Sequence, residues 1–198
     1  MSVKKFATEI RREQIAQAAV ELIASQGMKG FNMAGLARQV GVAPSAIYHH
    51  FKNKDEVIEA VLDHLQNRLL GNVRSVLSMT PHPLDQLKQL LAAHVELVVG
   101  HSAMPRILFS EDIYGGKSEH RSRLKDIIMR YISELASIFR QGQQVRSIRP
   151  ELDPEALAVM FLGLLQPTAI LWHLSDGEFD AKKQVEKGWS IFAEAIRP

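Results

Sequence analysis

Apolar residues recur at three- and four-residue intervals along almost the whole chain. Near the N-terminus, for example, Ile15, Ala19, Leu22 and Ile23 fall on one side of a helix with 3.6 residues per turn. Alternating apolar and polar runs joined by a hairpin dipeptide, which are typical of paired strands, are nearly absent. The sequence therefore predicts an all-α protein.

Helix breakers divide this pattern into about nine expected helices. Thr8 is a suitable N-cap for the first helix and Gly27 a suitable left-handed end, while Pro44 fits the first turn of another. The segment 80–83 is a rigid break, and Pro167 should kink the helix that contains it. The expected helices cover about residues 8–26, 33–39, 44–50, 54 to the break at 80, 84–99, 105–112, 119–141, 154–174 and 180–196.

These helices form two groups that differ in length and charge. Three short helices make an N-terminal head, residues 1–54, and six more make a C-terminal body, residues 55–198, joined directly through the fourth helix. The head holds eight Lys and Arg against three acidic residues, whereas the whole chain has a net charge of only +2. A basic head on a mildly acidic body is typical of nucleic-acid binding, although short segments also vary in charge by chance.

Composition narrows the class of protein. With 46% hydrophobic residues the chain can bury a core, and the lack of cysteine excludes disulfides and cysteine-ligated metals. We find no apolar run of the roughly 18 residues that a membrane span needs, and no apolar stretch follows the basic N-terminus as in a secretory signal. We therefore expect a soluble, cytoplasmic protein without a cofactor.

The segment 32–54 carries the clearest functional signal. Two short helices separated by the turn Gly41-Val42-Ala43 make a helix-turn-helix, whose second helix enters the major groove of DNA. Ile47 and Phe51 would face the core, leaving the side with Tyr48 toward solvent. Hydroxyl, imidazole and ammonium groups on that side suit a phosphate-rich partner. The candidate DNA-binding residues are Asn32, Met33, Pro44, Ser45, Tyr48, His49, Lys52 and Lys54.

This segment resembles the signature of the tetracycline-repressor (TetR) family. The matching stretches are LARQVGVA over residues 36–43 and IYHHFKNKDEV over residues 47–57, within a resemblance that covers about residues 8–62. The resemblance implies that Tyr48, Lys54 and Asn32 contact the DNA backbone and that Ser45 and His49 approach the bases. It also implies a dimer that binds a palindromic operator, acts most often as a repressor and is released by a small molecule.

In this family the last two helices form the dimer interface, and the sequence permits this arrangement. The helix expected at 154–174 carries more apolar residues than one inner face requires: Phe161, Leu164, Leu165, Leu171 and Trp172. An apolar face left exposed would need a partner. The alternative is a central helix that is fully buried within a single subunit.

The resemblance places an effector pocket among helices four to eight of the body. No charged residue lies within an apolar stripe there, so we expect a largely apolar or aromatic ligand. Residues of these types are more often ordinary core residues than ligand contacts. The candidates are His94, His101, Met104, Phe109, Tyr114, Met129, Tyr131, Gln166 and Trp172, with His173 as a further polar group.

Two other classes of protein compete with the regulator. A helical-bundle enzyme would use the eight histidines, but the sequence holds no Glu-x-x-His pattern, no Gly-x-Ser-x-Gly and no phosphate-binding glycine loop. A helical interaction module that does not bind DNA explains the helices but not the spacing of Tyr48, Phe51 and Lys54. We therefore expect no enzyme activity, no metal site and no membrane partner. Repressor and activator roles both stay open.

Overall fold

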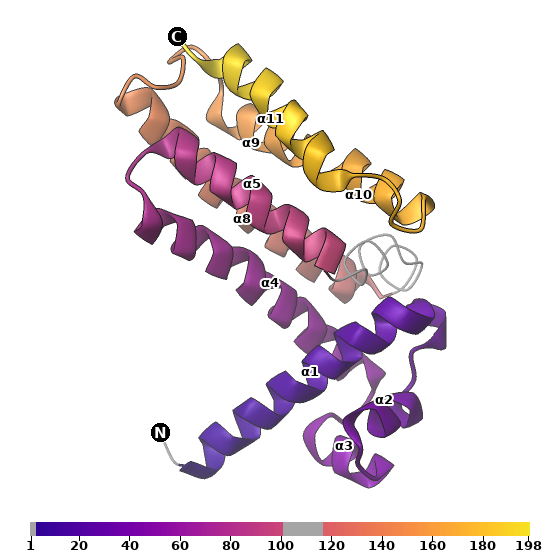
Figure 1. The fold of residues 1–198 in the computed structure, drawn as a ribbon. Helices are drawn as coiled ribbons and strands as arrows, with labels where there is room; N and C mark the ends of the chain where they lie inside the picture. Colours follow the sequence, from indigo (N-terminus) through magenta and orange to yellow (C-terminus); the bar gives the residue numbers. More distant parts are fainter. Residues whose placement is uncertain (1–2, 101–116) are drawn as a thin grey trace. The chain divides into compact units, whose positions relative to one another are not determined.

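The computed structural model describes residues 3–100 and 117–198, and all regular secondary structure in this part is helical (Figure 1). The expected all-α fold is confirmed. The helix expected at 105–112 lies outside the described residues. The helices are α1 (Val3–Gly30), α2 (Met33–Val40), α3 (Pro44–His50), α4 (Lys54–Met79), α5 (Pro83–Gly100), α8 (Ser118–Gln144), α9 (Pro154–Gly163), α10 (Gln166–Leu174) and α11 (Ala181–Ile196).

Local capping chemistry explains several of these boundaries. The side chains of Asn32, Asp153 and Asp180 each accept a hydrogen bond from a backbone N–H in the first turn of α2, α9 and α11, respectively. Gly41 ends α2 in the left-handed conformation. At Gly27 the backbone has φ 72° and ψ 171°, which breaks the geometry of α1, and a short helical turn then continues to Gly30.

The described chain forms two compact units. The first holds the described parts of 1–68 and 101–124, and the second holds 69–100 and 125–198. Helices α4 and α8 therefore each contribute residues to both units. A division into a head and a body after residue 54, as expected from the sequence, stays a prediction.

Each unit has its own apolar core. In the first unit, Leu36, Ile47, Phe51 and Leu62 are fully buried. In the second, Leu87 and Leu135 are equally buried, and four aromatic rings pack edge to face or tilted with centroids 6.1–6.4 Å apart. These rings belong to Phe139, Phe161, Trp189 and Phe192.

The segment 154–174 is broken rather than gently kinked. Helix α9 ends at Gly163 and α10 begins at Gln166, so the break precedes Pro167, which lies in the first turn of α10. A proline is tolerated in the first turn of a helix because its missing N–H would have no partner there. Within a continuous helix, by contrast, its ring would clash with the carbonyl four residues earlier. The sequence therefore predicts that Pro167 disturbs the helix, but the break lies about one turn before the proline.

The same segment, Pro154–Leu174, has 21 residues and contains an 18-residue window with a mean hydropathy of 1.6. It is the one stretch of the described chain that is long and apolar enough to cross a membrane, and 33% of its most apolar window is buried. The expectation that no apolar run reaches this length is therefore wrong. The same length and composition also fit a pair of helices, here α9 and α10, with one apolar side that is not covered within the single chain.

Candidate nucleic-acid interface

The turn between α2 and α3 has the backbone geometry that a helix-turn-helix needs. Gly41 has φ 73° and ψ 35°, and its N–H donates to the carbonyls of Ala37 and Arg38. The N–H of Val42 also donates to the Ala37 carbonyl, at 3.0 Å. Because a side chain is strained at this φ, glycine fits the position best. The turn then leads into α3, on which Ile47 is fully buried.

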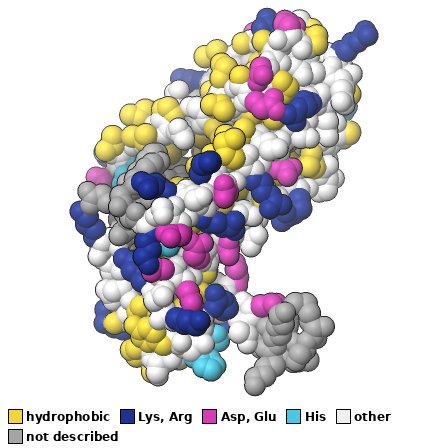
Figure 2. All heavy atoms as spheres, turned by 180° about the vertical axis from the view of Figure 1, so that it is seen from behind, with side chains coloured by type: hydrophobic (Ala, Val, Ile, Leu, Met, Phe, Trp, Pro, Cys, Tyr) yellow, Lys and Arg dark blue, Asp and Glu magenta, His cyan; other side chains and the backbone are white. Residues whose placement is uncertain are grey.

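The opposite side of α3 is exposed, as the sequence predicts. Tyr48 keeps 52% of its surface exposed. Ser45, His49 and Pro44 are exposed beside it, and Lys52 follows just after the helix. Figure 2 shows Lys, Arg and His side chains at the surface of the end of the molecule that contains α1–α3. This side offers hydrogen-bond donors and positive charge to a polyanion.

Asn32 and Lys54, both predicted backbone contacts, also have structural partners. The Asn32 side-chain oxygen accepts from the Gly35 N–H at 2.8 Å, and its amide nitrogen donates to the Gly30 carbonyl at 3.1 Å. The Lys54 ammonium lies 5.6 Å from the centroid of the Phe31 ring. Lys54 therefore lies beside Phe31, the residue that precedes Asn32 at the start of α2. Met33, the remaining candidate here, is half-buried.

Helix α1 contributes two residues that the sequence analysis did not single out. Arg12 donates to the carbonyl of His50, and its guanidinium carbon lies 4.1 Å from the centroid of the Phe51 ring. Glu13 contacts His64 of α4, with 2.5 Å between Oε1 and Nδ1. A signal was available, since Arg12 lies three residues before Ile15, on the side of α1 that carries the apolar stripe.

A row of ion pairs joins α4 to the start of α8 within the first unit. Lys117 Nζ lies 2.5 Å from Asp55 Oδ2, and the same distance separates Arg123 Nη2 from Asp63 Oδ1. Between them the buried ring of His120 has Nε2 3.5 Å from an oxygen of Glu59. The hydrogen bond from Lys117 to Asp55 raises the pKa of Lys117. These contacts attach residues 117–124 to the helix that follows α3.

In the second unit, two of the predicted effector residues lie together. Nδ1 of His94 on α5 is 3.3 Å from the hydroxyl oxygen of Tyr131 on α8, and the two rings meet at 61°. Burial lowers the pKa of His94 to about 4 and raises the pKa of Tyr131. At neutral pH the pair is therefore uncharged and consists of a half-buried imidazole and a buried phenol.

Three other predicted effector residues are described, and none of them has a recorded contact with this pair. Met129 and Gln166 are exposed, and Trp172 is half-buried, with its indole ring lying against Gly177. Four further candidates, His101, Met104, Phe109 and Tyr114, lie outside the described residues.

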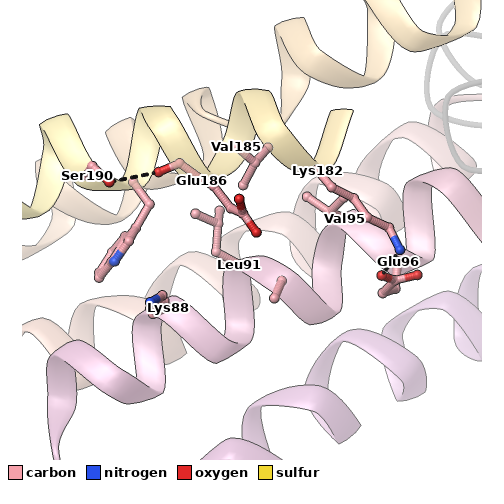
Figure 3. A pocket seen from close by; sticks show the side chains of 10 residues that line it. Lys88, Leu91, Val95, Glu96, Lys182, Val185, Glu186 and Ser190 are labelled. Carbon is pink, nitrogen blue, oxygen red and sulfur yellow. Dashed lines mark hydrogen bonds and ion pairs between the residues drawn. The ribbon is translucent and has the colours of Figure 1, made fainter. Parts of the chain in front are cut away.

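A groove of about 510 Å³ lies between α5 and α11 (Figure 3). Buried apolar side chains form its floor, and the salt bridge from Lys182 to Glu96, 2.5 Å long, crosses it. Charges of both signs line its rim, so the groove has no preference for one sign. None of the predicted effector residues lines it. The lining residues are Lys88, Leu91, Ala92, Val95, Glu96, Lys182, Val185, Glu186, Trp189 and Ser190.

Helices α9, α10 and α11 share a set of large apolar side chains that lack cover. Leu174 and Ile191 keep about three quarters of their surface exposed. The alternative of a fully buried central helix is therefore wrong for the single chain, although Phe161 and Leu165 do face its core. We call this set the α9–α11 apolar face; it consists of Val159, Met160, Ile170, Leu171, Leu174 and Ile191.

Comparison with known proteins identifies the family. Residues 15–61 match the family described as "Bacterial regulatory proteins, tetR family". Residues 80–196, more than half of the chain, match the description "Tetracyclin repressor-like, C-terminal domain". The chain belongs to the TetR family. It is therefore a DNA-binding transcriptional regulator, in a family of ligand-responsive repressors.

Relatives of this TetR-family chain match it over most of its length. The fatty acid metabolism regulator protein of Bacillus subtilis is 25% identical over 167 residues, which are 84% of this chain and 86% of that protein. The nucleoid occlusion factor SlmA of Vibrio vulnificus is 22% identical over 188 residues, covering 94% and 96%. FadR of Bacillus subtilis in complex with stearoyl-CoA has the same fold, with a TM-score of 0.79, 23% identity and coverage of 93% and 98%.

Family membership also bears on the competing classes. The TetR family is one of regulatory proteins rather than enzymes. The described residues hold no group of three or more His, Asp or Glu side chains arranged to bind a metal ion.

Proposed function

We propose that this TetR-family protein is a homodimeric repressor whose α3 reads a palindromic operator and whose second unit binds an apolar effector. The observation that carries the proposal is the division of α3 into two sides. Ile47 is fully buried, whereas Tyr48, the next residue, keeps half of its surface exposed beside Ser45 and His49. A short helix that turns an aromatic ring, a hydroxyl and an imidazole outward is equipped to contact base edges and phosphates.

The roles proposed for the individual residues follow from their positions. Ser45 and His49 would approach the bases, and Tyr48 would contact the backbone. Lys52 and Lys54, near the start of α4, would add positive charge beside the phosphates. Asn32 would hold the start of α2 in place by its cap, so that backbone N–H groups there can face a phosphate.

The α9–α11 apolar face supports self-association. Because the two halves of a dimer present the same residues to each other, one apolar patch serves as both surfaces. Two copies of α3 must then be spaced about 34–36 Å apart to enter successive major grooves on one side of the DNA. A ligand that favours a different spacing would release the operator.

The effector proposed here is a long acyl chain carried on an uncharged polar group, such as an acyl thioester. The names of two matching proteins refer to fatty acid metabolism or to stearoyl-CoA, and the acyl chain of such a ligand is apolar although its coenzyme A part carries charged phosphates. The uncharged pair of His94 and Tyr131 supports the choice, because a neutral imidazole and a phenol can hydrogen-bond a carbonyl oxygen but do not neutralise a carboxylate.

Selection of operator DNA tests the regulator. Purified protein is mixed with a random duplex library, and bound DNA is sequenced, with Tyr48→Ala and Val145→Ala in parallel. Val145 is a matched control because it is also exposed, at 64%, but lies in the turn after α8. We expect a palindromic motif for the wild type and the control and its loss in Tyr48→Ala. Salt-sensitive binding without any motif would contradict sequence-specific regulation, and no binding at low salt would contradict DNA binding altogether.

The effector proposal has a separate test. Operator release is followed by fluorescence anisotropy with acyl-CoAs of increasing chain length and with coenzyme A alone. We expect release to strengthen with chain length, because each buried methylene contributes about 0.8 kcal/mol. Tyr131→Phe, which keeps the ring and removes the hydroxyl, should weaken release about tenfold. Equal responses to coenzyme A and to every acyl-CoA would rule out the acyl chain as the recognised group.

We propose α4 as the path between effector and DNA. Three residues separate its start from the end of α3, and it continues unbroken to Met79, so its last turns belong to the second unit. Leu69→Gly, at the point where the helix passes from one unit to the other, should weaken effector-driven release while leaving operator binding without effector intact. Normal release by a confirmed effector in this variant would exclude the lever.

A further inference from the structure

The C-terminal end of α3 lacks the features that usually fix a helix end. The helix has seven residues, too few to be stable without tertiary contacts. It ends at Phe51 in an extended conformation, φ −138° and ψ 118°, without a glycine cap. The last carbonyls of any helix lack partners within it, so a short recognition helix depends on other elements to hold this end.

One side chain of α1 supplies the missing contacts. Arg12 donates from Nη1 to the carbonyl of His50, the last residue of α3. Its guanidinium group also covers the ring of Phe51, 4.1 Å from the centroid, and that ring is fully buried. A cation at a helix C-terminus is favoured by the helix dipole, and a planar guanidinium can stack and donate at the same time.

The neighbouring His50 is consistent with a cation held in this place. The Nδ1 atom of His50 is buried and has no hydrogen-bond partner among the described residues. Burial, followed by the nearby His49, Arg11 and Arg12, lowers the pKa of His50. A lowered pKa disfavours a positive charge on the imidazole, which would repel the guanidinium from the helix end.

We propose that Arg12 is a positioning residue for DNA recognition: it fixes the orientation of α3 and thereby the sequence specificity of the protein. This inference rests on the proposed function of α3. Base contacts depend on the angle at which a helix enters the groove, so a small rotation about the buried Ile47 would displace Ser45 and His49. Phosphate contacts carry no sequence information, so a change in them affects operator and non-specific DNA alike.

A direct phosphate contact is the competing role for a basic residue in this head. The two roles differ in what they change. Loss of a phosphate contact weakens binding to all DNA alike and lowers the salt dependence by about one unit of slope. Loss of a positioning contact lowers the ratio of operator affinity to non-specific affinity. The geometry favours positioning, since the Arg12 guanidinium already binds a carbonyl and a buried ring.

The neighbouring Arg11 provides a matched control. It is also half-buried and on α1, but its Nη1 donates to Gln14 of the same helix, at 3.1 Å, rather than to α3. Arg12→Gln and Arg11→Gln therefore remove the same charge from adjacent positions. Affinities for the selected operator and for a scrambled duplex are measured by anisotropy at several salt concentrations. We expect Arg12→Gln to reduce the affinity ratio about tenfold or more and Arg11→Gln to leave it unchanged.

A second variant keeps the test decisive if Arg12→Gln fails to fold. Arg12→Lys preserves the charge but not the planar stack on Phe51, so positioning predicts an affinity ratio between those of wild type and Arg12→Gln. If Arg12→Gln does not fold, the positioning role still predicts that the affinity ratio of Arg12→Lys lies below the wild-type value. A phosphate contact predicts a wild-type ratio and a wild-type salt slope for Arg12→Lys. A wild-type ratio in both Arg12 variants would overturn the inference alone, whereas a wild-type protein that selects no motif would overturn the proposed function.

Discussion

Ile191 offers the sharpest test of self-association, because its side chain is 74% exposed on the α9–α11 apolar face. Full burial of such a side chain is worth about 1.5–3 kcal/mol, so its remaining burial in a dimer would contribute roughly 1–2 kcal/mol. Two-fold symmetry doubles this to about 2–4 kcal/mol. Ile191→Ser should therefore raise the dimer dissociation constant by about 30- to 1000-fold.

Sedimentation equilibrium over a dilution series measures that constant directly. Val145→Ser is the matched control, since Val145 is an aliphatic residue of similar exposure outside the apolar face. At concentrations where both proteins are dissociated, the unfolding free energy of the Ile191→Ser monomer should stay within about 0.5 kcal/mol of that of the wild-type monomer, because the side chain is exposed in the single chain. An unchanged dissociation constant, or equal weakening by Val145→Ser, would show that the apolar face does not mediate the dimer.

Three further predictions concern the stability of the fold. Because burial lowers the pKa of His94 to about 4, protonation favours the unfolded chain, and the unfolding free energy should fall by up to about 3 kcal/mol between pH 7 and pH 4; denaturant titrations at each pH should show a flatter profile for His94→Gln. Asn32→Ala removes the cap on the Gly35 N–H and should cost about 1 kcal/mol, most of which Asn32→Ser should restore in thermal melts. Gly142→Ala would place a methyl 2.8 Å from Cγ1 of Ile148 and closer still to Cδ1, so calorimetry should show a loss of roughly 1–3 kcal/mol despite the better helix propensity of alanine.

The local features of the fold were predictable because they follow from neighbouring residues. Gly41 and the buried position of Phe51 define the helix-turn-helix within a dozen residues of sequence. Asn32 as a cap and Pro44 in a first turn are equally local. These features depend on backbone geometry and helical period, which a sequence encodes at short range.

The contacts between distant segments were not predictable in the same way. Lys117 and Asp55 are 62 residues apart, and a single sequence has no signal that pairs one surface charge with another. His94 and Tyr131 were each candidates, but only tertiary packing makes them partners. Arg12 falls between these cases. Its position on the apolar side of α1 could be read from the sequence, but its acceptor on α3 could not.

The make-up of the first unit limits how this protein can be dissected. Its described residues come from two stretches of chain, the N-terminal 68 residues and the turns at 117–124 that attach to α4 through Asp55, Glu59 and Asp63. A fragment cut after residue 68 would keep those carboxylates but lose their counterions, and the face of α4 that covers His120 would be open to water; a fragment cut after residue 54 would lack the carboxylates altogether. A chimaera meant to graft this DNA specificity onto another sensor must therefore carry both stretches, with the crossover points inside α4 and α8 rather than in a loop.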